Sequence, residues 1–227
     1  EYIYPRTPEK NMNTVQPLVS QKFASELGIV LKKRLSRALR EAGIPVADIS
    51  YSYFSSKDGP GNEKVRISIT TSDKCLEEAS AVLSGTLASL KTYGTSPEEY
   101  RDAQAELVMS MMREYSGDVK SNTGYVEQCI SSYLYGASLA SAATSMDFFI
   151  KKNLQDDLSA RLFNNFVTAL IDKSGNLTFR CVCDSLAGEN AFRKFNTSWT
   201  PKETGSYTVS YADTLKLKKS SSKLKLK

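Results

Sequence analysis

The residues with the clearest chemical potential are two cysteines that lie two positions apart, Cys181 and Cys183. They belong to segment 177–183, whose apolar alternation predicts a strand with both thiols on one face. Such a pair forms half of a zinc or redox site. The other two cysteines, Cys75 and Cys129, do not make a matching second pair. We therefore favour a structural interpretation, in which the two thiols act as small apolar side chains on a buried strand face.

The chain contains no histidine among its 227 residues. This excludes the Ser-His-Asp and Cys-His couples, acid–base catalysis by an imidazole, and the His-x-x-Glu-His zinc motif. We therefore expect that the chain as given is not an enzyme by itself and holds no cofactor.

The net charge of +5 is concentrated at the C-terminal end. Residues 213–227 hold six of the 30 basic residues and one of the 25 acidic residues, so 24 of each sign remain in the rest. We interpret this tail as an interdomain linker or an edge strand protected by lysines. A phosphate-binding or membrane-surface role is the alternative. The tail after Leu215 has no arginine or aromatic residue to stack on bases, so we expect no nucleic-acid partner.

Hydrophobic periodicity predicts one strand hairpin and several helices. The pattern favours strands at 49–53 and 64–69, joined by a loop at 56–62, and a further strand at 177–183. It favours helices at 17–42, 73–93, 96–115, 125–135, 141–151 and 154–170. Residues 1–15 and the chain after Asp184 read as irregular, although either end could complete the sheet. This order predicts an α+β fold, with an antiparallel sheet packed against several long helices. No apolar run reaches the roughly 20 residues that span a bilayer.

The helix expected at 96–115 contains two informative local patterns. Ser96-Pro97-Glu98-Glu99 is typical of a capping box, in which Ser96 accepts from the third helical N–H and Glu99 reaches back. The cluster of Met109, Met111 and Met112 is interpreted as core filler rather than as an adaptable binding surface.

Three stretches together resemble a known family. They are Leu31 to Glu41, the hairpin at 49–70 with the helix that follows it, and Gly94-Thr95-Ser96-Pro97-Glu98-Glu99-Tyr100. In this order the chain resembles, over residues 18 to 184, the non-catalytic repeat domain of the pitrilysin/insulinase family of zinc metallopeptidases, which includes the mitochondrial processing peptidase.

The resemblance implies a role within a larger protein. Members of this family are clamshells of two halves, with the zinc site in one domain and related domains shaping the chamber around the substrate. It implies that residues 1–212 form such a non-catalytic domain, a fragment of the parent, and that 213–227 is the linker. The zinc is then expected in another domain, and the partners are the other domains and the peptide substrate. A scaffold or partner subunit with no zinc site anywhere is the alternative. If the source is bacterial, the resemblance favours the periplasm or cell envelope.

The resemblance also suggests one substrate-binding pair. Some members use an arginine and a tyrosine, in the C-terminal half, after the helix that matches 31–41. Arg40 and Tyr51 lie in that region here, although their separation is longer than the usual spacing. The alternative is a solvated arginine at a helix end and a tyrosine that faces the core.

Overall fold

The computed structural model describes residues 2–6, 16–55, 63–117, 122–135, 139, 144, 147, 157–171, 178–183 and 185–202. The lysine-rich tail, the hairpin loop and all but two residues of the helix expected at 141–151 lie outside the described residues. In the described part of the chain, no helix is long and apolar enough to span a bilayer.

The sheet has four antiparallel strands in the order β2-β3-β1-β4. The strands are β1 (Tyr2–Arg6), β2 (Val46–Ser55), β3 (Glu63–Thr71) and β4 (Thr178–Phe179). The hairpin expected from the alternation is therefore confirmed. The expectation that residues 1–15 are irregular is wrong for Tyr2–Arg6, which pairs with β3 on one side and β4 on the other. Only long-range pairing stabilises this short segment, so local periodicity did not reveal it.

The helices account for most of the remaining described residues. They are α1 (Gln16–Glu41), the short 3₁₀ turn η1 (Asp73–Cys75), α2 (Leu76–Tyr93), α3 (Pro97–Gly117), α4 (Asn122–Tyr135), α6 (Asp157–Leu170) and α7 (Ser185–Thr197). The expectation that the chain loosens after Asp184 is wrong, because α7 follows. This helix buries Ala191 and Phe195 fully, and those two positions are too short an apolar stripe to predict a helix.

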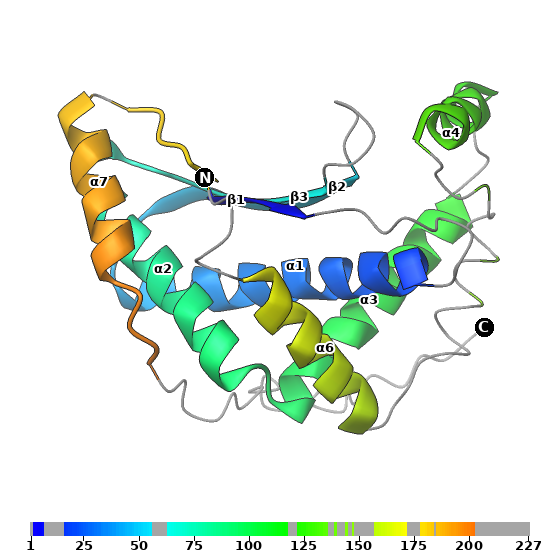
Figure 1. Cartoon of the computed structure of the whole chain (residues 1–227), viewed down its shortest axis with the longest axis horizontal. Helices are drawn as coiled ribbons and strands as arrows, with labels where there is room; N and C mark the ends of the chain where they lie inside the picture. Colours follow the sequence, from blue (N-terminus) through cyan, green and yellow to red (C-terminus); the bar gives the residue numbers. More distant parts are fainter. Residues whose placement is uncertain are drawn as a thin grey trace, which may run out of the picture.

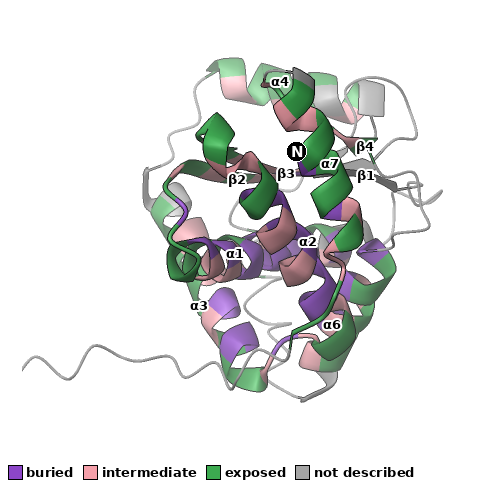
Figure 2. Cartoon of the chain, turned by 90° about the vertical axis from the view of Figure 1, so that its left-hand side faces the viewer, coloured by how far each residue is buried: buried purple, intermediate pink, exposed green. Residues whose placement is uncertain are grey.

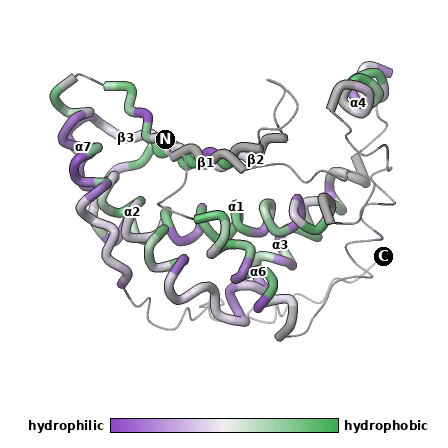
Figure 3. Tube along the Cα trace, in the orientation of Figure 1, coloured by the Kyte–Doolittle hydropathy of each residue, from purple (hydrophilic) through white to green (hydrophobic). Residues whose placement is uncertain are grey.

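Helices α1, α2, α3 and α6 lie on one side of the sheet, and α7 stands at its β4 end beside α2 (Figure 1). The architecture is the expected α+β fold. Buried residues gather along α1 and α2, between the sheet and the outer helices (Figure 2). Along the chain trace, hydrophobic segments of α1 and α2 alternate with hydrophilic ones, as expected for amphipathic helices (Figure 3).

Helix α1 lies close to the sheet because Gly28 has no side chain. A Cβ atom at this position would stand 2.5 Å from Cδ1 of Tyr51 on β2. The Tyr51 ring therefore occupies the space that a larger residue in α1 would need. Leu27, Leu31 and Leu35 of the same helix are fully buried around this contact.

The interpretation of the methionine cluster as core filler is wrong for two of its three members. Met109 is 62% exposed and Met112 is 48% exposed on α3. Helix α4 also exposes large apolar side chains. These are Tyr125, Val126, Ile130 and Tyr133. Scattered apolar exposure is ordinary, but several exposed apolar side chains on one helix form a surface that can bind another protein surface.

Candidate functional site

A buried ion pair joins the two helical stretches that stood out in the sequence. Nε of Arg34 in α1 donates to Oε1 of Glu99 in α3 at 2.7 Å, and Nη2 donates to Oε2 at 2.6 Å. Nη2 also donates to the carbonyl oxygen of Gly94 at 2.7 Å. The side chains of Arg34 and Glu99 are 9% and 3% exposed. The planar guanidinium matches a carboxylate in this two-point geometry, so the pair fixes the angle between α1 and the α2–α3 turn.

The same turn is held from a third helix. Asn164 in α6 accepts hydrogen bonds at its Oδ1 from both the backbone N–H and the hydroxyl of Thr95, each at 3.0 Å. Gly94 adopts a φ of +68°, and a Cβ at this residue would lie 2.8 Å from Cγ of Asn164. Positive φ and lack of space both require glycine here. The turn therefore connects α1, α2, α3 and α6.

The capping box forms only by half. Oγ of Ser96 accepts from the backbone N–H of Glu99 at 3.1 Å, as expected. The Glu99 carboxylate, however, binds Arg34 instead of reaching back to the Ser96 backbone. A charged guanidinium is a stronger partner for a carboxylate than a neutral amide, so the tertiary contact replaced the local one.

A groove opens beside this ion pair. It has a volume of about 670 Å³ and lies between α1, α2 and residues 198–202. Its wall is small and apolar where Ala38, Ala81 and Gly85 face it, and Arg34, Arg37 and Glu99 make its polar end. The backbone N–H of Lys202 donates to Oγ of Ser89 at 2.9 Å and holds the 198–202 segment in place. The lining offers hydroxyl, carboxylate and guanidinium groups, which can form hydrogen bonds with a polar ligand.

The second candidate surface is the face of the sheet turned away from α1. Val65 and Ile67 of β3 point to the helices and are buried, whereas Arg66 and Ser68 alternate with them on the other face. Ser50 pairs across the strands with Ser68, and Ser52 with Arg66. Within the described ranges, no helix packs against this face of β2 and β3 (Figure 1).

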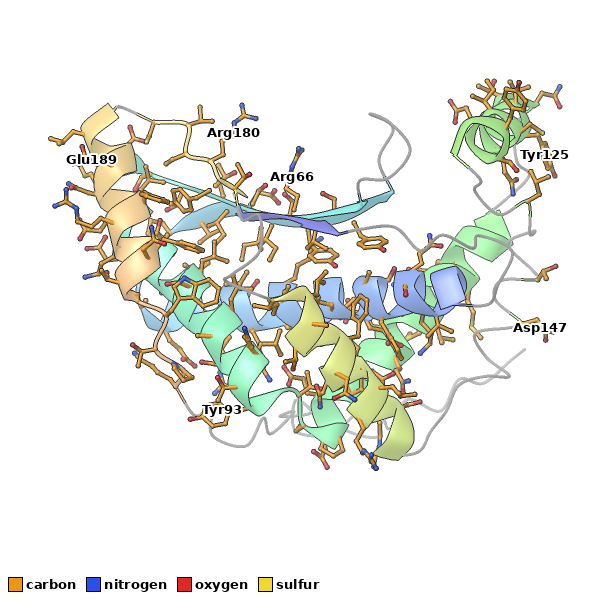
Figure 4. The ribbon with its side chains drawn as sticks, viewed as in Figure 1. Arg66, Tyr93, Tyr125, Asp147, Arg180 and Glu189 are labelled. Atoms are coloured by element: carbon orange, nitrogen blue, oxygen red, sulfur yellow. The ribbon has the colours of Figure 1, made fainter. Side chains whose placement is uncertain are left out.

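This face, formed by Ser50, Ser52, Arg66, Ser68 and Thr70, is called the polar sheet face below. Figure 4 shows Arg66 pointing away from the helices, and Arg180 after β4 pointing outward as well. Hydroxyl and guanidinium groups here can donate to peptide carbonyl oxygens. Asp48 pairs with Thr70 across the strands and adds an exposed carboxylate to the same face. The polar sheet face can therefore form hydrogen bonds with a polypeptide.

Solved structures share this architecture. The first half of the periplasmic protease PqqL from Escherichia coli matches with a TM-score of 0.70 and 13% identity over 88% of this chain. The whole PqqL protease matches with a TM-score of 0.68 and 16% identity, also over 88%. An insulinase-family protease from Yersinia pestis matches over 88% with a TM-score of 0.62 and 12% identity. The chain has an insulinase-like fold.

The chain with this insulinase-like fold spans 44% of the PqqL half, 22% of whole PqqL and 43% of the Yersinia protein. No protein-family model matches the sequence, and no curated protein matches it. The fold likeness therefore comes from the arrangement of elements, at sequence identities of 12% to 16%.

The structure does not bring Arg40 and Tyr51 together. Arg40 is exposed in the last turn of α1, whereas the Tyr51 ring contacts Gly28 of the same helix. Twelve residues of α-helix separate these points by about 18 Å along the axis. Burial, with a smaller contribution from Tyr53, raises the pKa of Tyr51, as expected for a core tyrosine. Substrate binding by Arg40 or Tyr51 stays a prediction.

The two cysteines lie beyond the strand that was expected to carry them. Strand β4 ends at Phe179, and Cys181 and Cys183 are half-buried in the connection to α7. Their Sγ atoms are 3.1 Å apart. Burial, and then the neighbouring Cys183, raises the pKa of Cys181 to about 11. The expectation that the two cysteines lie on a buried strand face is therefore wrong, because the alternating pattern continues past the last paired residue.

Sequence reasoning missed a buried ion pair within α1. Nζ of Lys22 lies 2.6 Å from Oε1 of Glu26, which is fully buried. Burial raises the pKa of Glu26, and the Lys22 charge opposes that shift. The i,i+4 spacing of the two charges was visible, but it is also typical of solvated helix faces.

Proposed function

We propose that this chain is a non-catalytic structural domain of an insulinase-like zinc metallopeptidase and forms part of the wall of its proteolytic chamber. The observation that carries the proposal is the match of 88% of the chain to 44% of the PqqL half. A domain that matches less than half of the PqqL half is, in this proposal, one of several domains of a larger parent protein. The absence of histidine from the sequence supports a structural role rather than a zinc-binding one.

The polar sheet face is the part of the wall that meets substrate. It is the broad surface of the sheet that the described helices leave open, and its side chains can form hydrogen bonds with a polypeptide. The exposed apolar side chains of α3 and α4 suit contacts with neighbouring domains of the parent. A peptide substrate and these other domains are therefore the partners that we propose.

The part of the chain that the structure describes contains no group of three or more His, Cys, Asp or Glu side chains that could hold a metal. We therefore assign the metal to another domain of the parent, where it would activate water for attack on the peptide bond. A periplasmic location accompanies this proposal, since PqqL is a periplasmic protease.

The sequence of the complete parent gene gives the first test. A His-x-x-Glu-His motif outside this segment supports the peptidase. Its absence would instead support the alternative, a scaffold or partner subunit from a family member without zinc.

Photo-crosslinking in the complete parent tests the position of the polar sheet face. A crosslinking amino acid replaces Ser50 or Thr70, which are exposed on that face, or Arg101, which is exposed on α3 and serves as the matched control. We expect an unfolded peptide substrate to crosslink at the two sheet positions and not at Arg101. Equal labelling at all three positions, or labelling at Arg101 alone, would contradict a chamber wall at this face.

The purified chain should not hydrolyse a mixture of peptides by itself. The physical reason is that it carries no histidine and its described residues offer no metal site. Hydrolysis that a metal chelator abolishes would contradict this prediction.

A further inference from the structure

We propose that Cys181 and Cys183 form an oxidation site, where a small-molecule disulfide converts the two thiols into an intrachain disulfide that closes the connection between β4 and α7. This inference goes beyond the proposed function and does not depend on it. It concerns a local redox modification, which a domain of any parent protein could undergo.

The geometry brings the two sulfurs close without a bond. The Sγ–Sγ distance of 3.1 Å exceeds a disulfide bond of about 2.05 Å by roughly 1 Å. Rotation of the two side chains about their χ1 bonds can supply an approach of this size. The described backbone also bends at Cys183.

The surroundings leave the pair accessible and give it room. Cys181 and Cys183 are themselves only half-buried, and Val182 between them is 81% exposed, so a small reagent can reach the connection. On the other side lies Gly188, in the first turns of α7. A Cβ atom there would stand 3.2 Å from Sγ of Cys183, so glycine leaves space for this sulfur to move.

A disulfide fits this pair better than a metal does. Two thiolates on one tetrahedral zinc, each at about 2.3 Å, would stand about 3.8 Å apart. The observed sulfurs are already closer than that. The described residues also provide no third His, Cys, Asp or Glu to complete a metal group with them.

The chemistry balances as two thiol–disulfide exchanges. The thiolate of one cysteine attacks a sulfur of oxidised glutathione, forms a mixed disulfide and releases one glutathione thiol. The second cysteine then attacks the protein sulfur of the mixed disulfide and releases the other glutathione. Two electrons and two protons pass from the cysteines to the glutathione disulfide, and the bond between Cys181 and Cys183 forms.

The bond would constrain the point where α7 is attached. Phe195 of α7 packs on Phe179 of β4, with ring centroids 5.0 Å apart, so the two elements are already in contact. The cysteines lie in the short chain that connects them. A closed loop at this place limits the freedom of the first turn of α7.

Peptide mass mapping tests the proposal on the intact chain. Trypsin cuts after Arg180 and after Arg193, so one peptide, 181–193, holds both cysteines and neither of the other two. The folded protein is incubated with oxidised glutathione, quenched, alkylated and digested. We expect peptide 181–193 to lose two hydrogens and to take up no alkyl group.

The single variants Cys181→Ser and Cys183→Ser provide the control. Each variant keeps one thiol of the pair. This thiol should remain as a mixed disulfide with glutathione, because no neighbouring thiol can displace the glutathione. Exposed Cys129 should behave in the same way in every variant. The inference is overturned if peptide 181–193 of the unsubstituted chain takes up two alkyl groups or keeps bound glutathione.

Amide hydrogen exchange then tests the constraint on α7. We expect the amides at the start of α7 to exchange more slowly in the oxidised chain than in the reduced chain. Equal exchange in the two forms would overturn the proposed constraint.

Discussion

Single charged residues carry much of the organisation of this domain. Arg34 uses two of its nitrogens to hold Glu99 and the Gly94 carbonyl, and both charged side chains are almost fully buried. A buried pair of this kind contributes little over an apolar contact of equal size, but the loss of one partner is costly. Its main effect here is to select one arrangement of α1 against the α2–α3 turn.

Replacing Arg34 with methionine should therefore strongly destabilise the fold. The variant leaves the Glu99 carboxylate buried without its partner, and we expect a loss of about 3 to 5 kcal/mol in the free energy of unfolding. Urea unfolding measures this loss. The double variant Arg34→Met/Glu99→Leu should lose less than the single variant, since no charge is then left unpaired.

The exposed pair of Arg193 and Glu189 provides the matched control. Arg193→Gln should cost less than about 1 kcal/mol, because surface ion pairs contribute little. Equal losses for Arg34→Met and Arg193→Gln would show that the buried pair does not organise the fold.

Glu26 should make stability depend on pH in a defined direction. Burial raises its pKa in the folded chain above the ordinary value of 4.5, so the folded state binds the proton more tightly than the unfolded state. The stability that this group contributes is present below pH 4.5 and is lost as pH rises through the folded pKa.

We therefore expect Glu26→Gln to gain stability relative to the unsubstituted chain as pH rises from about 4 toward neutrality. Urea unfolding of both proteins across this pH range gives the difference between their free energies of unfolding. The contributions of the other carboxyl groups are the same in both proteins and cancel in this difference. A difference that does not change with pH would contradict the raised pKa.

At the scale of elements, the turn between α2 and α3 is the main connection. It accepts a hydrogen bond from Arg34 of α1 and donates one to Asn164 of α6, and its backbone conformation requires glycine at position 94. The stretch from Gly94 to Tyr100, which contributes to the family resemblance, therefore has a structural role.

Gly94→Ala should destabilise the α2–α3 turn more than an alanine substitution of glycine at another helix end. The variant forces alanine into a positive φ with a ψ of −152° and pushes Cβ against Asn164. We expect a loss of about 3 kcal/mol in the free energy of unfolding. Gly43→Ala is the control, because φ is +69° there but no atom lies within 4 Å of the added Cβ.

Thermal or urea unfolding distinguishes the two glycine variants. Gly43→Ala should cost only about 1 kcal/mol, from the backbone conformation alone. If both variants lost the same amount, the contact with Asn164 would have no energetic role.

Helix α7 depends on one aromatic side chain. Phe195 is fully buried and packs on Phe179 and Trp199. Phe195→Ala should cost about 3 to 5 kcal/mol, measured by urea unfolding. Phe192 also contacts Phe179 but is half exposed, so Phe192→Ala should cost clearly less. The reverse order would contradict the observed placement of α7.

At the scale of the whole molecule, the described elements form a sheet with helices packed on one of its faces, α1 nearest to the strands (Figure 1). Exposed apolar side chains occur on α3, at Met109 and Met112, and along α4, which is compatible with the contacts to further domains that we propose. Its match to less than half of each compared structure agrees with this view.

Charges on α4 should weaken association without unfolding the chain. Val126 and Ile130 are exposed and lie four residues apart, so Val126→Lys/Ile130→Lys places two charges on one side of α4. We expect stability to change by less than about 1 kcal/mol, since both sites are at the surface. Binding to the separately produced remainder of the parent should fall by about tenfold or more, as measured by calorimetry. Val182→Lys is the control. An equal loss of binding affinity for Val182→Lys would contradict the proposed role of α4 in association.

The sequence by itself determined the elements whose signals are local. The apolar stripe of α1, the hairpin of β2 and β3, and the helix starts at Ser96 and Pro97 follow from periodicity and capping, because each acts within a few residues. The absence of histidine likewise excluded several kinds of catalysis without any structure.

Only the tertiary structure decided the features that depend on distant contacts. Strand β1 exists through its pairing with β3 and β4, α7 through Phe195, and the partner of Glu99 is Arg34 rather than its own helix end. The cysteine pair shows the same division. Its alternation was visible in the sequence, but the end of β4 at Phe179 places it in an accessible connection, since strand pairing rather than residue pattern sets where a sheet stops.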